Sequence, residues 1–244
     1  MTKIRADLHM HSTFSDGRES PKEIIIKAVE KGLSAISITD HDTFQGAIVA
    51  RNIVSEGSYD IVVLLGAEIR ANEGDILIYC LEEPLEKIPR NALELLDTAH
   101  ENNCLAVPAH PFDIRRKGIG ELVYEGKWDA IEVFNSMSDP ISNQKAMEAA
   151  RILNLPGLAN SDAHVAEAIG SAYNIITVDD LSEAAIMEAI KSGRVTPVPG
   201  RPGFGAIAST LMWSIERRLK RRKKGPSRLD YVDRVEDEYF YGRT

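Results

Sequence analysis

The chain has 244 residues, 43% of them hydrophobic and 27% charged, which suffices for one α/β domain with a substantial core. Its formal net charge of −8 argues against a surface that binds long nucleic acids, and the longest apolar stretch, residues 61–67, is too short to cross a bilayer. The first residues lack the apolar segment of a signal peptide, so we expect a cytoplasmic protein that does not bind membranes.

Short apolar runs alternate with amphipathic segments, a rhythm typical of a parallel α/β fold in a single domain. Strands are predicted at residues 6–9, 34–39, 61–68, 74–81, 104–109, 130–134 and 156–160. Both a (β/α) barrel and a doubly wound open sheet show this rhythm, and periodicity alone does not separate them.

The helices have recognisable ends. Ser20-Pro21-Lys22-Glu23 is a capping box with proline at the first helical position, and Gly32 is a suitable residue to end that helix. Further helices are predicted to run through residue 54, over 89–102, from Asp139-Pro140, and from Asp180 to near Gly193.

A C-terminal helix is predicted to extend the barrel of residues 1–202 over residues 203–244. Residues 217–224 carry seven basic side chains, and an acidic, aromatic stretch follows at 230–241. We favour a solvated helix end with a neutralising tail, and a contact with short RNA is the alternative.

The only two cysteines, Cys80 and Cys104, each lie in an apolar run. We interpret them as buried thiols in a reducing compartment rather than as a disulfide or a metal pair.

Histidines and carboxylates gather where the predicted strands end. His9 and His11 form an H-x-H pair, whose side chains point the same way in an extended segment, and Asp16 follows in a turn. The other polar residues at strand ends are Asp40, His41, Asp42, Glu68, His110, Glu132, Asn135, Asp162 and His164. Catalytic groups of a parallel barrel gather at the C-terminal ends of its strands, and imidazoles with carboxylates suit Zn, Mn or Fe. His100 lies inside a helix and is expected to be an ordinary histidine.

The order of five motifs resembles the PHP (polymerase and histidinol phosphatase) superfamily over about residues 4–200. The motifs are D-L-H-x-H-S at 7–12, T-D-H-D at 39–42, G-x-E at 66–68, A-H-P at 109–111 and S-D-A-H at 161–164. The resemblance implies a distorted seven-stranded (β/α)7 TIM-like barrel that binds two or three divalent ions, namely Zn, Mn or Fe, with Mg as a further candidate.

The same resemblance implies which residues hold each ion. The first ion would be held by His9, His11, Glu68 and Asp162. The second would share Glu68 and use His110, and the third would use Asp16, His41 and His164. Some members have a histidine where this chain has Asn135, which is therefore expected either to be a weak ligand of the second ion or to orient substrate or water.

The implied activity is hydrolysis of a phosphate ester by a hydroxide bridging the first two ions. Small substrates such as histidinol phosphate, a nucleotide 3′,5′-bisphosphate or a short oligonucleotide are expected. An amidohydrolase-like enzyme that cleaves C–N bonds and a non-catalytic PHP module are the alternatives.

Six residues are candidates for catalytic, orienting or substrate-binding roles. Asp40 and His41 are the catalytic candidates, with Asp40 and Asp42 orienting neighbours or transferring protons. Local hydrogen bonding in a turn explains Asp42 equally well. Arg115 or Arg116 is expected to bind the substrate phosphate, and Arg201 is a weaker candidate.

Overall fold

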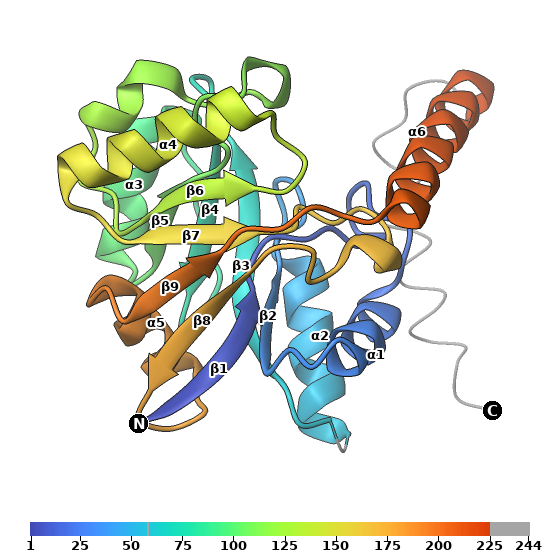
Figure 1. Ribbon diagram of the computed structural model, residues 1–244, viewed down its shortest axis with the longest axis horizontal. Helices are drawn as coiled ribbons and strands as arrows, with labels where there is room; N and C mark the ends of the chain where they lie inside the picture. The colour runs from blue at the N-terminus through green and yellow to red at the C-terminus, as the bar shows by residue number, and fades with distance from the viewer. Residues whose placement is uncertain (58, 225–244) are drawn as a thin grey trace.

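The computed structural model describes residues 1–57 and 59–224, with side chains as far as residue 219. Within that range the fold is mixed α/β (Figure 1). The strands are β1 Thr2–Asp7, β2 Ala35–Ile38, β3 Val62–Arg70, β4 Asp75–Cys80, β5 Leu105–Pro108, β6 Ile131–Asn135, β7 Gly157–Asn160, β8 Tyr173–Val178 and β9 Val195–Val198. The α-helices are α1 Pro21–Glu30, α2 Gln45–Glu56, α3 Ala92–Glu101, α4 Pro140–Leu153, α5 Glu183–Lys191 and α6 Phe204–Lys224, and the 3-10 helices are η1 Ile114–Arg116, η2 Gly120–Tyr124 and η3 Ala166–Ala168.

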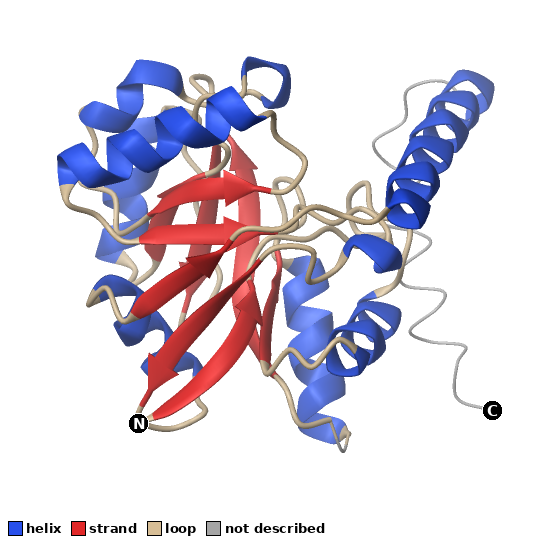
Figure 2. Cartoon of the chain, in the orientation of Figure 1, coloured by secondary structure: helices blue, strands red, loops and turns tan. Residues whose placement is uncertain are grey.

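A seven-stranded sheet in the order β5-β4-β3-β2-β1-β8-β9 curls into a half-barrel, as Figure 2 shows. The separate pair β6–β7 lies between β5 and β9, with β6 against β5 and β7 against β9. The prediction of a distorted TIM-like barrel is therefore confirmed. The strands β8 and β9 were not predicted from the sequence.

The expectation of parallel strands is only partly right. The pairs β1–β2, β2–β3 and β6–β7 are parallel, whereas β3–β4, β4–β5, β1–β8 and β8–β9 are antiparallel. Strand periodicity carries no information on direction, and the short connection between β3 and β4 makes them a hairpin.

Strand direction decides which residues meet at the edge of the barrel that carries the polar cluster. Because β4 is antiparallel to β3, its first residue, Asp75, lies opposite Arg70 at the same edge where β3 ends. The strand β9 is antiparallel to β8, which is itself antiparallel to β1, so β9 ends at that edge too. The chain therefore enters α6 beside the polar cluster.

The helix ends follow ordinary capping chemistry. The capping box predicted at the start of α1 is present: the Ser20 side chain accepts from the amide of Glu23, whose carboxylate accepts from the amide of Ser20 at 2.8 Å. Two helices begin later than predicted: Asn91 caps α3, for which a start at residue 89 was predicted, and Ser182 caps α5, for which a start at residue 180 was predicted. Both accept backbone hydrogen bonds through their side chains.

Apolar side chains fill the barrel and both of its outer faces. Ile4, Leu8, Leu77 and Tyr79 are among the buried residues of one cluster, and the Tyr79 hydroxyl donates to the backbone oxygen of Leu8 at 2.8 Å. The other clusters pack helices α1 to α4 against the sheet. The polar cluster consequently lies against a closely packed apolar core.

Cys80 and Cys104 form a disulfide, so the prediction of two free thiols was wrong. The antiparallel register that places Tyr79 opposite Leu105 brings Cys80 next to Cys104, with 4.1 Å between their Cα atoms. Only the pairing of β4 with β5 creates this proximity.

Helix α6 projects away from the barrel in Figure 1, beginning at Phe204. No helix in the described part of the chain is long and apolar enough to cross a membrane. The acidic stretch at 230–241 lies outside the described residues, and the division at residue 202 stays a prediction.

Candidate metal centre

The strand ends bring the predicted histidines and carboxylates together in one buried cluster. In the described chain, three sets of side chains have ligand atoms close enough to share an ion, and all of their members were predicted from the sequence as ligands. The sets are His11, Asp16, His41 and His164; His9, His110 and Asp162; and His9, His11 and Glu68. A fourth set adds Asp75 to Glu68 and His110.

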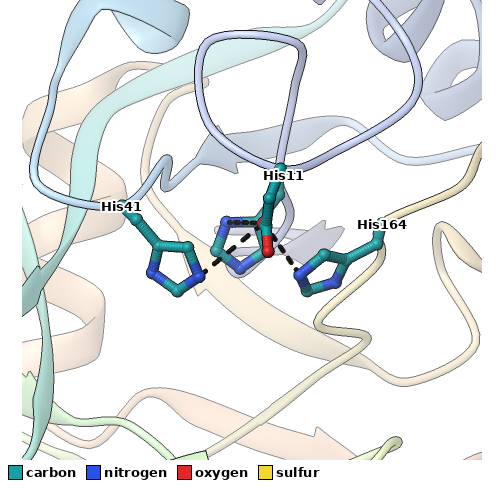
Figure 3. A group of neighbouring side chains, drawn as sticks. His11, His41 and His164 are labelled. Carbon is teal, nitrogen blue, oxygen red and sulfur yellow. Dashed lines mark ion pairs between the residues drawn. The ribbon is translucent and has the colours of Figure 1, made fainter. Parts of the chain in front are cut away.

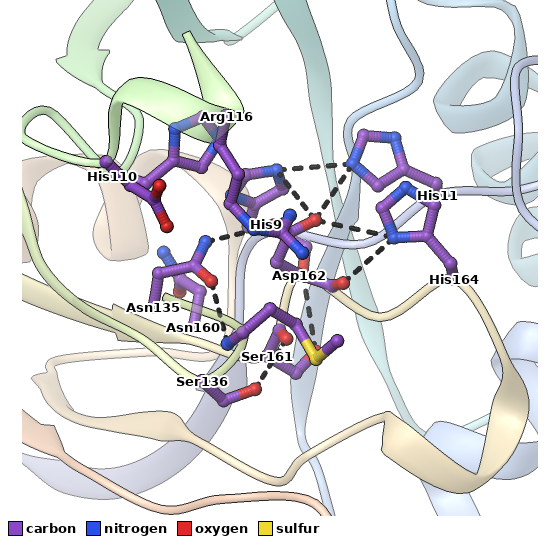
Figure 4. A network of polar contacts seen from close by, with 12 residues as sticks. His9, His11, His110, Arg116, Asn135, Ser136, Asn160, Ser161, Asp162 and His164 are labelled. Atoms are coloured by element: carbon purple, nitrogen blue, oxygen red, sulfur yellow. Dashed lines mark hydrogen bonds and ion pairs between the residues drawn. The ribbon is translucent and has the colours of Figure 1, made fainter. Parts of the chain in front are cut away.

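His9 and His11 form the centre of the cluster, as Figure 4 shows. Their Nε2 atoms lie 3.3 Å apart. Glu68 Oε2 is 3.5 Å from His9 Nε2 and 3.3 Å from His11 Nε2, and Asp162 Oδ1 is 3.6 Å and 3.3 Å from the same two atoms. Tetrahedral ligands at about 2.0–2.2 Å from an ion are roughly 3.3–3.6 Å from one another. Each of the two carboxylate oxygens therefore lies at tetrahedral ligand spacing from both imidazoles.

The burial and backbone of these residues also fit a metal site. Glu68 Oε2 and Asp16 Oδ1 are buried and accept no hydrogen bond from the described residues. His110 and Asp162 adopt φ angles of 33° and 50°, a region that side-chain-bearing residues rarely occupy. Buried carboxylate oxygens that accept no hydrogen bond, and a strained backbone, are costly unless a ligand compensates for them.

A second group of imidazoles consists of His11, His41 and His164 (Figure 3). Asp16 Oδ1 lies 3.0 Å from His164 Nε2, 3.7 Å from His41 Nε2 and 3.9 Å from His11 Nδ1. Burial, with His164 and His41 close by, lowers the pKa of His11 to about 3. The neutral His11 ring keeps a lone pair available for an ion.

Two glycines allow the backbone to pack closely near the proposed ligands. A Cβ on Gly17 would lie 2.0 Å from the backbone oxygen of His11, so the turn after Asp16 folds tightly onto the H-x-H segment. A Cβ on Gly66 would lie 2.1 Å from Ser37 Oγ, which explains the glycine of the G-x-E motif.

Asp75 belongs to the cluster, although sequence reasoning missed it. His110 Nε2 lies 3.0 Å from Glu68 Oε1, and Asp75 joins these two residues within ligand distance. Asp75 Oδ1 is buried and accepts no hydrogen bond from the described residues. Burial, reinforced by the charge of Glu68, raises the pKa of Asp75 to about 7. A parallel β4 would have placed this residue at the opposite edge of the barrel.

Glu132 lies beneath the ligands and holds two of them. Its Oε1 accepts from His9 Nδ1 at 2.9 Å and from Asn160 Nδ2 at 2.9 Å. Its Oε2 accepts from the His110 amide at 2.7 Å and from Asn135 Nδ2 at 3.1 Å. The bond to Nδ1 fixes the tautomer of His9 with Nε2 free to face the cluster. The sequence placed Glu132 at a strand end but gave it no role.

Asn135 faces the cluster through its amide nitrogen. Nδ2 donates to Asp162 Oδ2 at 3.1 Å as well as to Glu132, while Oδ1 accepts from the Met137 amide at 2.9 Å. This orientation lets Asn135 hold two carboxylates in place, and it directs the amide oxygen away from the ligand atoms.

Asp40 and Asp42 are both engaged in loop contacts. Asp40 accepts from the Ser12 amide at 2.8 Å and from the Ser12 hydroxyl at 2.6 Å, and the Ser15 hydroxyl donates to it as well. Asp42 accepts from the Arg70 amide at 3.1 Å and from Arg90 at 2.6 Å. Asp40 thus shapes the loop that carries Asp16.

The arginines of the A-H-P loop point in different directions. Arg116 donates from NH1 to Asp162 Oδ2 within the cluster (Figure 4). The Arg115 side chain is 72% exposed and pairs with Asp113 and Asp139 instead. Arg201 donates to the backbone oxygens of Ser136 and Ser138 and so anchors the segment before α6.

Neighbouring positive charges outweigh the effect of burial on the pKa values of two carboxylates in the cluster. Burial raises the pKa of Asp162, but Arg116 and His9 outweigh it and hold that pKa well below its usual range. Burial likewise opposes ionisation of Glu68, yet His41 and His9 keep the pKa of Glu68 well below the ordinary value. His100 lies outside this network and is paired with Asp129 at 2.9 Å.

Comparison of the sequence with known protein families identifies the family of this chain. The PHP domain family matches residues 7–113, and the PHP-associated family matches residues 140–195. The uncharacterized protein MJ1587 of Methanocaldococcus jannaschii is 30% identical over 156 residues, which is 59% of this chain and 90% of that protein. The chain belongs to the PHP family.

Two further relatives of this PHP protein are informative. A 5′-3′ exoribonuclease of Haemophilus influenzae is 39% identical over 72 residues, 30% of this chain and 25% of that enzyme. A two-domain protein from Bacteroides vulgatus, which contains a predicted PHP-like metal-dependent phosphoesterase, superposes with a TM-score of 0.68. It is 23% identical, and the match covers 82% of this chain and 65% of that chain, so this likeness shows the shared fold.

Proposed function

We propose that this PHP protein is a metal-dependent phosphoesterase that hydrolyses a small phosphomonoester, a nucleotide or a short oligonucleotide. The observation that carries the proposal is the buried set His9, His11, Glu68 and Asp162, in which each carboxylate lies at tetrahedral ligand spacing from both imidazoles. Membership of the PHP family and the matched exoribonuclease segment support phosphate-ester chemistry.

The cluster has ligands for three ions. We propose that His9, His11, Glu68 and Asp162 hold the first ion. Asp16, His41 and His164 would hold the third. For the second ion we propose Glu68, His110 and Asp75, with Asn135 as a positioning residue in place of the ligand role expected from the sequence. A second site with two carboxylates and one imidazole favours harder ions such as Mn or Mg over a softer ion.

Bound divalent ions would polarise a phosphoryl oxygen and favour deprotonation of an attacking water. The protein supplies the arrangement around them. Glu132 sets the tautomer of His9 and anchors the backbone of His110. Asp40 holds the loop of Asp16, and Arg116 offers a guanidinium to a substrate phosphate. Asp40 consequently acts on the loop, and His41 is proposed as a ligand of the third ion.

Product release tests the proposal: inorganic phosphate from phosphomonoesters, nucleotides from short oligonucleotides and amines from amide substrates. The full chain is freed of metal, reloaded with Mn, Zn or Mg, and assayed against histidinol phosphate, nucleotide bisphosphates, short oligonucleotides and amide substrates. His9→Ala and Asp162→Ala should each lower turnover by at least about a hundredfold, and His100→Ala, a histidine outside the cluster, should not. Cleavage of amides alone, or no cleavage with any metal, would refute the proposal.

The assignment of Asp75 has its own test. Asp75→Asn should lower the amount of Mn bound per chain by up to one ion, measured by elemental analysis after dialysis. Asp179→Asn removes the same charge from an exposed carboxylate that pairs with Arg194, and it should bind as much Mn as the unmodified protein. Equal metal content in both variants would rule out Asp75 as a ligand.

A further inference from the structure

Helix α6 sends two side chains back to the loop that carries Asp16. Trp213 Nε1 donates to the backbone oxygen of Asp16 at 2.8 Å, and Arg217 NH1 donates to the same oxygen at 3.0 Å. The two residues are one helical turn apart and so share a face. Ala206, earlier on the helix, is buried in the core formed with α1 and η3. The helix is therefore fixed to the metal-ligand loop, although most of its length stands clear of the barrel.

The two oxygens of Asp16 face different neighbours. Oδ1 faces the imidazoles, 3.0 Å from His164 Nε2, whereas Oδ2 is paired with Arg217 NH1. The Arg217 side chain is 27% exposed, while those of Asp16 and His164 are 14% and 13% exposed. The guanidinium thus lies between the buried imidazoles and solvent.

Arg116 occupies the matching place on the other side of the cluster. It pairs through NH1 with Oδ2 of Asp162, whose Oδ1 faces His9 and His11, and its side chain is also 27% exposed. Two arginines from separate elements consequently cover the outer oxygens of two proposed ligand carboxylates.

We propose that Arg217, the first residue of the basic run 217–224, binds the substrate phosphate together with Arg116. This inference rests on the proposed phosphoesterase function and assigns the C-terminal helix to the site. A guanidinium has five N–H donors in a planar fork, and the contacts of Arg217 among the described residues all use NH1. Asp16 orients the guanidinium, and the remaining donors can bind two phosphate oxygens.

The next residue along the helix provides a matched control. Arg218 carries the same charge but is exposed, and it makes no hydrogen bond or ion pair in the described part of the chain. Arg217→Ala and Arg218→Ala therefore remove equal charge and differ in the contact with Asp16. Arg217→Lys keeps the charge and removes the planar fork.

Binding of inorganic phosphate to the Mn-loaded full chain, followed by calorimetry, tests the inference. Arg217→Ala should weaken phosphate binding by at least about tenfold, the loss expected for a charged hydrogen-bond donor. Arg217→Lys should fall between it and the unmodified protein, and Arg218→Ala should change affinity by less than about twofold. Metal content and thermal unfolding, measured on each variant, should match those of the unmodified protein.

Three other results would overturn the role proposed for Arg217. Equal phosphate affinity in the two alanine variants would overturn the role of Arg217. Loss of bound Mn in Arg217→Ala would overturn it too, because Arg217 would then act only by positioning Asp16. Failure of the unmodified, Mn-loaded protein to bind phosphate would also overturn it. An unmodified protein that binds phosphate in an Arg217-dependent way but hydrolyses no phosphate ester would refute the proposed function and leave this inference standing.

Discussion

Replacing Glu132 by glutamine should lower both the free energy of unfolding and the affinity of the proposed metal centre for its ions. The Glu132 carboxylate is fully buried and accepts from four donors: His9 Nδ1, Asn160 Nδ2, the His110 amide and Asn135 Nδ2. A glutamine has one oxygen, so in either orientation its NH2 group faces two of these donors. Each buried donor left unpaired costs about 1–3 kcal/mol, which gives a loss of roughly 2–6 kcal/mol in the free energy of unfolding.

The loss is large beside the total stability of a domain, about 5–15 kcal/mol. Urea unfolding of the metal-free protein, followed by circular dichroism, measures it. Calorimetric titration with Mn should also show affinity about 10–100-fold weaker, because Glu132 supports His9 and His110.

A surface variant controls for the loss of one carboxylate. Glu148→Gln breaks only an exposed pair with Arg151 and should leave the midpoint of urea unfolding unchanged. If Glu132→Gln unfolds at the same urea concentration as Glu148→Gln and binds Mn equally well, the supporting role assigned to Glu132 is wrong.

Three further predictions address other parts of the molecule. Gly46→Ala would put a Cβ 2.0 Å from Asp40 Oδ2 and should lower the unfolding free energy by about 2–4 kcal/mol. The Cβ of Gly205→Ala would meet no atom within 4 Å, so this variant should not be destabilised, and thermal melts compare the two. Reducing the disulfide, which links residues 24 apart, should lower the unfolding free energy by about 3 kcal/mol, and a melt unchanged by dithiothreitol would contradict the pairing. Arg115→Glu should leave KM within about twofold, because that side chain is 72% exposed and paired away from the cluster; a KM raised about tenfold would place it at the substrate.

Much of the candidate metal centre could be predicted from the sequence because its proposed ligands lie close to strand ends. The H-x-H pair alternates along an extended segment, and the carboxylates and histidines that follow other strands meet where those strands end together. The resemblance to PHP proteins added the ordering of the ligands. The capping box of α1 was equally readable, since all its hydrogen bonds join residues at most three apart.

Asp75, Arg217 and the disulfide depended on the tertiary structure. Asp75 joins the ligands because β4 runs antiparallel to β3, and Cys80 meets Cys104 because β4 pairs with β5. Arg217 reaches Asp16 across 201 residues, since β9 returns the chain to the edge that carries the cluster. Residue type and periodicity specify which side chains can bind an ion, but strand direction and register decide which of them meet. Those depend on contacts between segments far apart in the chain.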